Sequence, residues 1–202
     1  MITFSSMSPL SKPVKIIALV ILVILILSLT SLILFLTLRP HHPTFTIPKL
    51  DVLQLSLVPS LPHDLQIQSL FQVTFLSHNP DKRSSVEYDP VEVAASYKGQ
   101  RIAGVGVYRG FHQPQGESDL MTVPIAGFHL PSVTAWYELG MDLGAGKVVV
   151  SVEASGKLRW KILGFLPTRR FRFRVDCSAV VVLYGPGIWT LLEEPQCSKT
   201  HV

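Results

Sequence analysis

The chain has 202 residues, of which 48% are hydrophobic and 16% are charged, and its formal net charge at pH 7 is +4. An ordinary globular domain carries about 25% charged residues, so the apolar excess must have a local source. This composition excludes an intrinsically disordered chain. The length left after an N-terminal apolar segment suits one folded domain of common size.

The apolar excess lies in residues 16–38, a run without a charged residue, a proline or a glycine. As a helix this run would be about 34 Å long, slightly more than the roughly 30 Å hydrocarbon core of a bilayer. A cleaved signal peptide would have a shorter apolar region and a small-x-small site after it, and a buried core helix would have a polar face. The sequence therefore predicts an uncleaved transmembrane helix, preceded by a short cytosolic tail over residues 1–15.

Basic residues on either side of this run predict its orientation. Lys12 and Lys15 precede it, whereas Arg39 and Lys49 follow it. By the positive-inside rule, this slight bias places the short tail in the cytosol and the C-terminal domain outside it.

Beyond the membrane, residues 39–48 hold three prolines and two histidines and predict an extended stalk. Apolar and polar residues then alternate with a period of two, which is typical of strands with one buried face. Turn sequences such as Asn79-Pro80-Asp81 separate these stretches, and only residues 132–143 have a helical pattern, with Ser132 as the predicted N-cap. The clearest alternating stretches are residues 71–76, 91–97, 158–163 and 170–181.

About seven short strands and one short helix predict a mostly β domain over residues 49–184. The expected fold is an antiparallel β-sandwich, fibronectin type III-like, followed by a C-terminal tail over residues 185–202. A parallel doubly wound sheet is excluded, because its strands would be apolar on both faces and would alternate with helices.

Several short motifs occur in an order and spacing that resemble one plant family. The family is the hypersensitive-response-induced and non-race-specific disease resistance-like proteins, which carry a group 2 late embryogenesis abundant domain. The similarity covers residues 40–183, and it departs from the family at Asp81, where asparagine is more frequent, and in a longer tail after Leu183. The motifs are Arg39-Pro40, Pro43-Thr44-Phe45, Asn79-Pro80-Asp81, Tyr88-Asp89, residues 91–99, Phe111-His112-Gln113-Pro114 and the final strand from Val175.

The resemblance implies a β-sandwich on a single-pass protein of the plasma membrane, or alternatively of the endoplasmic reticulum or another endomembrane. It also implies a role in defence, including the hypersensitive response, or in abiotic stress, without known catalysis. We expect the sandwich to bind a partner or a surface: another defence protein, anionic lipid or cell-wall polysaccharide. The alternative is a module that binds lipid or another hydrophobic ligand between its sheets, and an enzyme is the third hypothesis. The resemblance supplies no ligand, so no functional residue carries over.

The residues themselves give no catalytic, cofactor or metal site. The sequence has no G-x-S-x-G, P-loop, H-E-x-x-H or C-x-x-C motif. The glycines of residues 104–110 miss the dinucleotide-binding spacing by one residue, which favours a strand edge or a bulge. His41 and His42 are adjacent, so an extended backbone would point them apart and not toward one metal ion.

The two cysteines, Cys177 and Cys197, leave two interpretations open. If the domain lies outside the cytosol, they could form a disulfide. Alternatively, Cys177 is a small apolar core residue and Cys197 is free.

The chain owes its positive charge to residues 157–174, which hold seven basic residues and no acidic one. Alternation on a predicted hairpin places five of them on the face opposite Trp160, Phe171 and Phe173. One interpretation is attraction to anionic lipid headgroups or acidic wall polysaccharide, and the other is an ordinary solvated face. Nucleic acid is not an expected partner. The seven are Lys157, Arg159, Lys161, Arg169, Arg170, Arg172 and Arg174.

Overall fold

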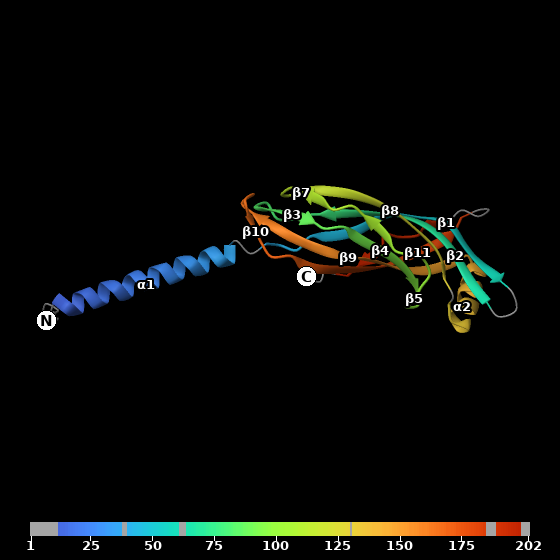
Figure 1. Ribbon diagram of the computed structural model, residues 1–202, viewed down its shortest axis with the longest axis horizontal. Coiled ribbons are helices and arrows are strands. Elements are labelled where there is room, and N and C mark those ends of the chain that lie inside the picture. Colours follow the sequence, from blue (N-terminus) through green and yellow to red (C-terminus); the bar gives the residue numbers. More distant parts are fainter. Residues whose placement is uncertain (1–11, 38–39, 61–63, 130, 185–188, 199–202) are drawn as a thin grey trace, which may run out of the picture. The chain divides into compact units, whose positions relative to one another are not determined.

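The computed structural model describes residues 12–37, 40–60, 64–129, 131–184 and 189–198. The chain divides into two compact units, Met1–Arg39 and Pro40–Val202. Within the described residues, the first unit holds one helix, and the second holds every strand and a second helix (Figure 1). We call the second unit the β domain.

The helix of the first unit, α1, spans Lys12–Thr37. Its stretch Pro13–Ile33 is long and apolar enough to cross a membrane. The hydroxyls of Ser28 and Thr30 donate hydrogen bonds to backbone carbonyls three residues earlier, at 2.9 and 3.0 Å, so neither needs water. The predicted N-terminal apolar helix is confirmed, while Leu38 and most of the predicted cytosolic tail lie outside the described residues.

The elements of the β domain follow one another with short connections. In chain order they are β1 (Thr44–Ser60), β2 (Asp64–His78), β3 (Ser84–Tyr88), β4 (Val91–Tyr97), β5 (Gln100–Arg101), β6 (Gly106–Tyr108), β7 (Phe111–Gln113), β8 (Ser118–His129), α2 (Val133–Gly144), β9 (Lys147–Ile162), β10 (Leu166–Pro167), β11 (Phe171–Leu183), β12 (Trp189–Leu191) and β13 (Gln196–Cys197).

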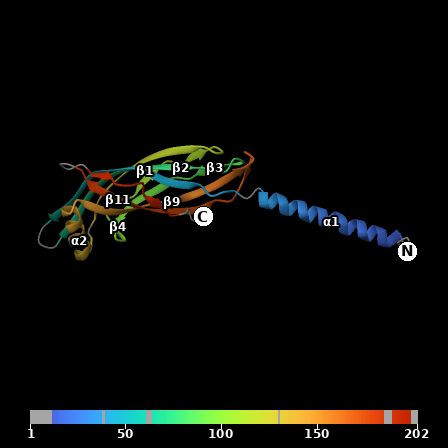
Figure 2. The same ribbon diagram turned by 180° about the vertical axis from the view of Figure 1, so that it is seen from behind.

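All thirteen strands belong to one antiparallel sheet, whose main path is β5-β4-β9-β11-β12-β1-β2-β8. The sheet nearly closes on itself, because β6 pairs with β4 and the N–H of Gly104 donates to the carbonyl of Ala126 in β8 at 3.1 Å. Helix α2 lies at one end of the β domain, and β3, β7 and β10 lie at the other (Figures 1 and 2). The predicted mostly β, antiparallel domain is confirmed. The finer prediction of a fibronectin type III-like sandwich of about seven strands is not, because thirteen strands form one continuous sheet.

Alternate residues of the long strands point into the core, as their sequences predict. Phe71, Val73 and Phe75 of β2 are at most 1% exposed, whereas the residues between them are half-buried. Each such side chain contributes about 1.5–3 kcal/mol when it is fully buried. The same alternation holds along β4, β9 and β11.

Four aromatic rings from four strands fill one region of the core. Phe45 of β1 stacks on Phe173 of β11 with ring centroids 5.5 Å apart, and Tyr88 of β3 stacks on Phe111 of β7 at 4.4 Å. Tyr88 also meets the edges of Phe45 and Phe173, so the two stacked pairs form one cluster.

The structure corrects the predicted stalk. Strand β1 begins at Thr44, and Pro43, Phe45 and Ile47 are buried, so most of residues 39–48 packs in the β domain. Pro48 has no N–H for the ladder, and the pairing of β1 with β2 shifts register between Thr46 and Lys49.

The predicted tail needs a similar correction, because β12 and β13 pair with β11 within residues 185–202. These two short strands have weak patterns of their own, and only their pairing partner identifies them as strands. Residues 185–188 and 199–202 lie outside the described residues.

Helix α2 begins where the sequence predicts. The hydroxyl of Ser132 accepts the N–H of Ala135 at 3.2 Å, which makes Ser132 its N-cap. The helix ends at Gly144, and Gly146, with a φ of +72°, turns the chain into β9.

Candidate functional site: a charged groove on β9 and β11

The seven basic residues of the predicted segment lie on two neighbouring strands and the connection before the second. In the pairing of β9 with β11, Lys157 lies opposite Arg172. The structure therefore brings the basic residues together, as the alternation suggests. Lys157, Arg159 and Lys161 lie on β9, Arg169 and Arg170 precede β11, and Arg172 and Arg174 lie on β11.

Strand β3 pairs with the other side of β9 and places Glu87 opposite Arg159. One carboxylate oxygen of Glu87 lies 2.8 Å from the Arg159 guanidinium and 3.2 Å from the Lys161 ammonium. The hydrogen bond from Arg159 is the main cause that lowers the pKa of Glu87 from 4.5 to about 2, against a smaller opposing effect of burial. Glu87 therefore stays ionised at physiological pH and neutralises part of the basic segment.

Two more basic residues have acidic partners on the same face. Arg174 lies 2.9 Å from Glu153 and 3.3 Å from Asp176, and Arg170 lies 3.2 Å from Asp89. All these carboxylates come from outside residues 157–174. Four of the seven cations therefore have an ion-pair partner, and the attraction of this face to an anionic surface stays a prediction.

A groove of about 650 Å³ opens beside these ion pairs. Gly156 lies in it, and a Cβ there would lie 3.0 Å from the Phe173 ring and 3.3 Å from the Pro90 carbonyl oxygen, so a larger residue would need small shifts of these neighbours. In the described part of the chain, Lys157, Arg172 and Glu92 have no ion-pair partner. The groove is lined by Asp89, Glu92 and Glu153, by Lys157, Arg172 and Arg174, and by Pro90, Ser155, Gly156 and Phe173.

A second polar region is buried, and the sequence motifs gave no hint of its role. The side chain of Asn79 is fully buried and donates to the carbonyls of Ser84 at 2.9 Å and Pro114 at 3.0 Å. Its oxygen accepts the N–H of Asp81 at 3.1 Å, and the Asp81 carboxylate accepts the N–H of Arg83 at 2.8 Å. The Asn79-Pro80-Asp81 motif thus builds the turn that joins β2 to β3.

Gln113 of β7 completes this buried network. Its amide nitrogen donates to the carbonyls of Ser77 at 2.8 Å and Glu117 at 3.1 Å. Its amide oxygen accepts from the hydroxyls of Ser77 at 3.1 Å and Tyr88 at 3.3 Å. Burial raises the pKa of Tyr88, so its hydroxyl keeps the proton that it donates. All four hydrogen-bonding positions of the Gln113 side chain are used, which makes the network structural.

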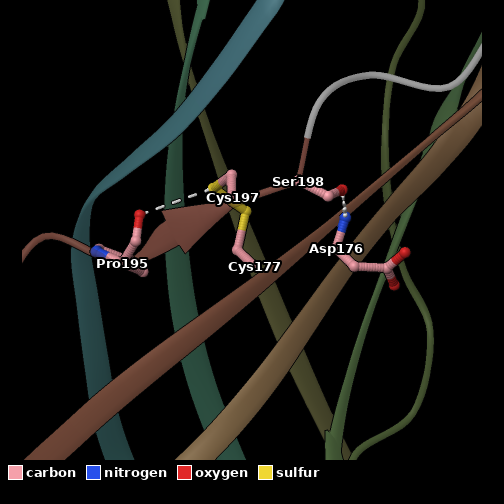
Figure 3. Close-up of a disulfide and its surroundings, with 5 residues drawn as sticks. All are labelled: Asp176, Cys177, Pro195, Cys197 and Ser198. Carbon is pink, nitrogen blue, oxygen red and sulfur yellow. Dashed lines mark hydrogen bonds between the residues drawn. A yellow bond between two sulfur atoms is a disulfide. The ribbon is translucent and has the colours of Figure 1, made fainter.

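The two cysteines lie opposite each other where β13 pairs with β11. A disulfide joins Cys177 to Cys197 in the structure (Figure 3). The N–H of Ser198 donates to the Asp176 carbonyl at 2.8 Å, and the N–H of Asp176 donates to the Ser198 hydroxyl at 3.0 Å. Because Cys177 is buried, the bond ties the C-terminal segment to the core of the sheet.

Other candidates from the sequence have structural explanations. His41 and His42 are exposed, and the His42 ring packs edge to face with Trp160, with ring centroids 5.9 Å apart. Across the described ranges, no three His, Cys, Asp or Glu side chains are grouped to hold a metal ion. A Cβ at Gly104 would lie 2.5 Å from the Ala126 carbonyl oxygen, so this glycine permits close packing against β8.

Comparison with known proteins assigns the family. A family model described as late embryogenesis abundant protein matches residues 74–178. NDR1/HIN1-like protein 26 from Arabidopsis thaliana is 33% identical over 173 residues, which cover 83% of this chain and 79% of that protein. The chain belongs to the NDR1/HIN1-like family.

Two further NDR1/HIN1-like relatives, both from Arabidopsis thaliana, align over similar lengths. Protein 1 is 29% identical over 74% of this chain and 71% of its own length. Protein 12 is 30% identical over 75% of this chain and 70% of its own length. A solved structure of a protein from Archaeoglobus fulgidus aligns with 72% of this chain and over 98% of its own length, with 10% sequence identity. Its TM-score of 0.32 is too low to carry an argument.

In this NDR1/HIN1-like protein, the late embryogenesis abundant match contains both polar regions. Residues 74–178 include the buried network around Asn79 and Gln113 and the charged groove on β9 and β11. Three of the motifs that indicated the family contribute side chains to the buried network: Asn79-Pro80-Asp81, Tyr88-Asp89 and Phe111-His112-Gln113-Pro114. The groove carries exposed charges of both signs.

Proposed function

We propose that this NDR1/HIN1-like protein is a non-enzymatic, single-pass membrane protein that acts in plant defence or abiotic stress responses. Its β domain would do so by binding a protein partner through the groove on β9 and β11. The family supports the physiological role, and the groove supports the binding.

The observation that carries the binding proposal is the set of charges that the groove leaves unpaired. Lys157 and Arg172 face each other on neighbouring strands, and Glu92 lies on β4 in the same groove. A protein surface carries both signs and can pair with all three side chains. An anionic lipid or an acidic polysaccharide would leave Glu92, which has no ion-pair partner in the described residues, facing like charge, which costs binding energy.

The alternative of a hydrophobic ligand held within the domain has less support. The aromatic cluster fills the core next to the groove, and one of its rings, Phe173, also lines the groove. Its four members are Phe45, Tyr88, Phe111 and Phe173. The groove itself is open to solvent, and six of its ten lining residues are charged, whereas a site for an apolar ligand is enclosed and carries only a few polar groups.

The membrane part of the proposal rests on α1 as the anchor. Lys12 and Lys15 favour a cytosolic N-terminus, which places the β domain outside the cytosol, at the plasma membrane or else within an endomembrane. The disulfide between Cys177 and Cys197 supports this orientation, because disulfides persist in oxidising compartments.

Charge reversal in the groove tests the partner proposal. The full chain is expressed in plant membranes as wild type and as the variant Lys157→Glu with Arg172→Glu, and each is chemically cross-linked. The yield of the partner that cross-links to wild type should be at least tenfold lower for the variant. The matched control is Lys147→Glu with Arg109→Glu, which makes the same charge change at two exposed positions outside the groove. Equal loss in the control, or no loss in the groove variant, would contradict the proposal.

A further inference from the structure

The turn between β9 and β10 carries an exposed apolar surface. Leu163, Phe165 and Leu166 are 56%, 75% and 55% exposed, and only Gly164 interrupts them. Single apolar side chains are common on protein surfaces, but several on one tight turn usually mark a contact with another surface. We call residues 163–166 the apolar tip.

The backbone of the apolar tip does not explain its sequence. Leu163 has a φ of +54° and Gly164 a φ of +81°. Glycine adopts this left-handed region freely, and asparagine or aspartate tolerate it better than leucine does. A polar residue at position 163 would therefore suit both the turn and the solvent, so the leucine indicates a function outside the fold.

Basic residues lie next to the apolar tip. The N–H of Leu163 donates to the carbonyl of Arg83 at 3.0 Å, so the turn that contains Lys82 and Arg83 lies beside the tip. On its other side, Arg169 follows Leu166 by three residues. Lys82 and Arg169 are both exposed. Exposed apolar side chains flanked by cations suit the boundary between anionic lipid headgroups and acyl chains.

The chain enters the β domain near the apolar tip. His42 packs against Trp160, which lies two residues before the end of β9. Helix α1 ends at Thr37, so the connection to His42 can extend to about 18 Å at most. If α1 is the membrane anchor, as proposed above, this short connection tethers the entry point to the membrane.

We propose that the apolar tip inserts into the headgroup region of the bilayer that holds α1, while Lys82 and Arg169 contact anionic lipid headgroups. The β domain then binds the membrane at a second point, which fixes the face that it turns to the lipid. This inference rests on the anchor of the proposed function and not on its protein partner.

Tryptophan fluorescence in vesicles tests the insertion. The full chain with Phe165→Trp is reconstituted into vesicles of phosphatidylcholine and phosphatidylserine, with bromine on the acyl chains of the phosphatidylcholine as quencher. The matched control is Phe128→Trp on β8, where the native side chain is 68% exposed. After subtraction of the wild-type signal, the tryptophan at position 165 should be quenched at least twofold more than the one at position 128.

Two further measurements separate the possible outcomes. Adding Lys82→Gln and Arg169→Gln to the Phe165→Trp chain should reduce quenching in anionic vesicles and leave it unchanged in vesicles of phosphatidylcholine alone. Flotation shows whether the chain is in the vesicles at all, and failure there would reject the anchor itself. Equal quenching at positions 165 and 128 in chains that float would overturn the inserted tip and leave it free for a protein.

Discussion

The β domain has two polar regions that use similar chemical groups in opposite surroundings. In the buried network, Gln113 and Asn79 are fully buried and donate hydrogen bonds at 2.8–3.1 Å to backbone carbonyls, one near in sequence and one more than 30 positions away for each. In the groove, Arg174 makes an ion pair with Glu153, and their side chains are 60% and 32% exposed. Gln113 has no hydrogen-bonding position to spare, whereas Lys157, Arg172 and Glu92 have no ion-pair partner in the described residues.

The difference follows from the cost of an unpaired polar group in each place. A buried group without a partner costs about 1–3 kcal/mol, because it has lost water and gained nothing. An exposed ion pair is worth about 0–1 kcal/mol, because water solvates each charge when its partner is removed. The buried network therefore contributes to the stability of the fold, whereas the ion pairs of the groove can be broken at little cost, as the proposed binding requires.

The replacement Gln113→Leu should have the largest effect on stability. It removes the hydrogen bonds between Gln113 and the carbonyls of Ser77 and Glu117 and the hydroxyls of Ser77 and Tyr88. The Glu117 carbonyl keeps the N–H of Asn79, and the two hydroxyls keep each other, so we expect a loss of about 3 kcal/mol in the free energy of unfolding, which comes from the four lost bonds. The measurement is urea unfolding of the full chain in detergent micelles, followed by tryptophan fluorescence. All three tryptophans lie in the β domain.

Gln100→Leu is the matched control. Gln100 also makes two short hydrogen bonds, to the hydroxyl and the N–H of Ser132, at 2.7 and 2.9 Å, but in an exposed position. Water can replace these bonds, so the loss should stay below about 1 kcal/mol. Equal losses in the two variants would remove the distinction between the buried network and the exposed regions.

Local patterns predicted much of the fold. The alternation of Phe71, Val73 and Phe75 depends only on the two-residue period of a strand. Ser132 caps a helix that begins at the next residue. Both features could therefore be predicted without knowing which distant residues they contact. The short strands β12 and β13 depend on their pairing with β11, which no local pattern reveals. The number of strands and the near-closure of the sheet were missed for this reason.

The candidate site was predicted in part, because its basic residues are close in sequence and its acidic ones are not. Arg159 and Glu87 are 72 positions apart, and only the pairing of β3 with β9 brings them together. The roles of Asn79 and Gln113 were missed for a related reason, since each bridges to a backbone carbonyl more than 30 positions away. The motifs identified the family but could not say what the side chains do.

The replacement Glu87→Gln should change how stability depends on pH. The pKa of Glu87 is lowered from 4.5 to about 2 in the folded protein, so its ionised form stabilises the fold above pH 4.5. This contribution is lost as the pH falls from about 4.5 to about 2. Because solvent screens this partly exposed site, we expect ionised Glu87 to contribute about 1 kcal/mol to the free energy of unfolding.

Urea unfolding of the full chain between pH 6 and pH 2 measures this dependence. The wild-type protein should lose its advantage over Glu87→Gln across that interval, and the two should converge near pH 2. Glu92→Gln is the control, because Glu92 has no ion-pair partner in the described part of the chain, and it should follow the wild-type curve. A constant difference between wild type and Glu87→Gln at every pH would contradict the assigned ion pairs.

The smallest effects on stability should come from Arg172→Gln and Arg174→Gln, which change two exposed residues of one strand. Arg174 pairs with Glu153 and Asp176, so its variant should unfold at a slightly lower urea concentration at low salt. The difference should vanish near 1 M salt, where the Debye length is about 3 Å. Arg172→Gln should not shift the unfolding midpoint at either salt concentration, because the described residues give Arg172 no ion-pair partner.

In partner cross-linking, Arg172→Gln should have the larger effect of the two variants, since the charge of Arg172 is free to meet a ligand and that of Arg174 is already neutralised. A salt-dependent destabilisation by Arg172→Gln equal to that by Arg174→Gln would show that Arg172 is paired within the chain, and the groove would lose the free charge on which its binding role depends.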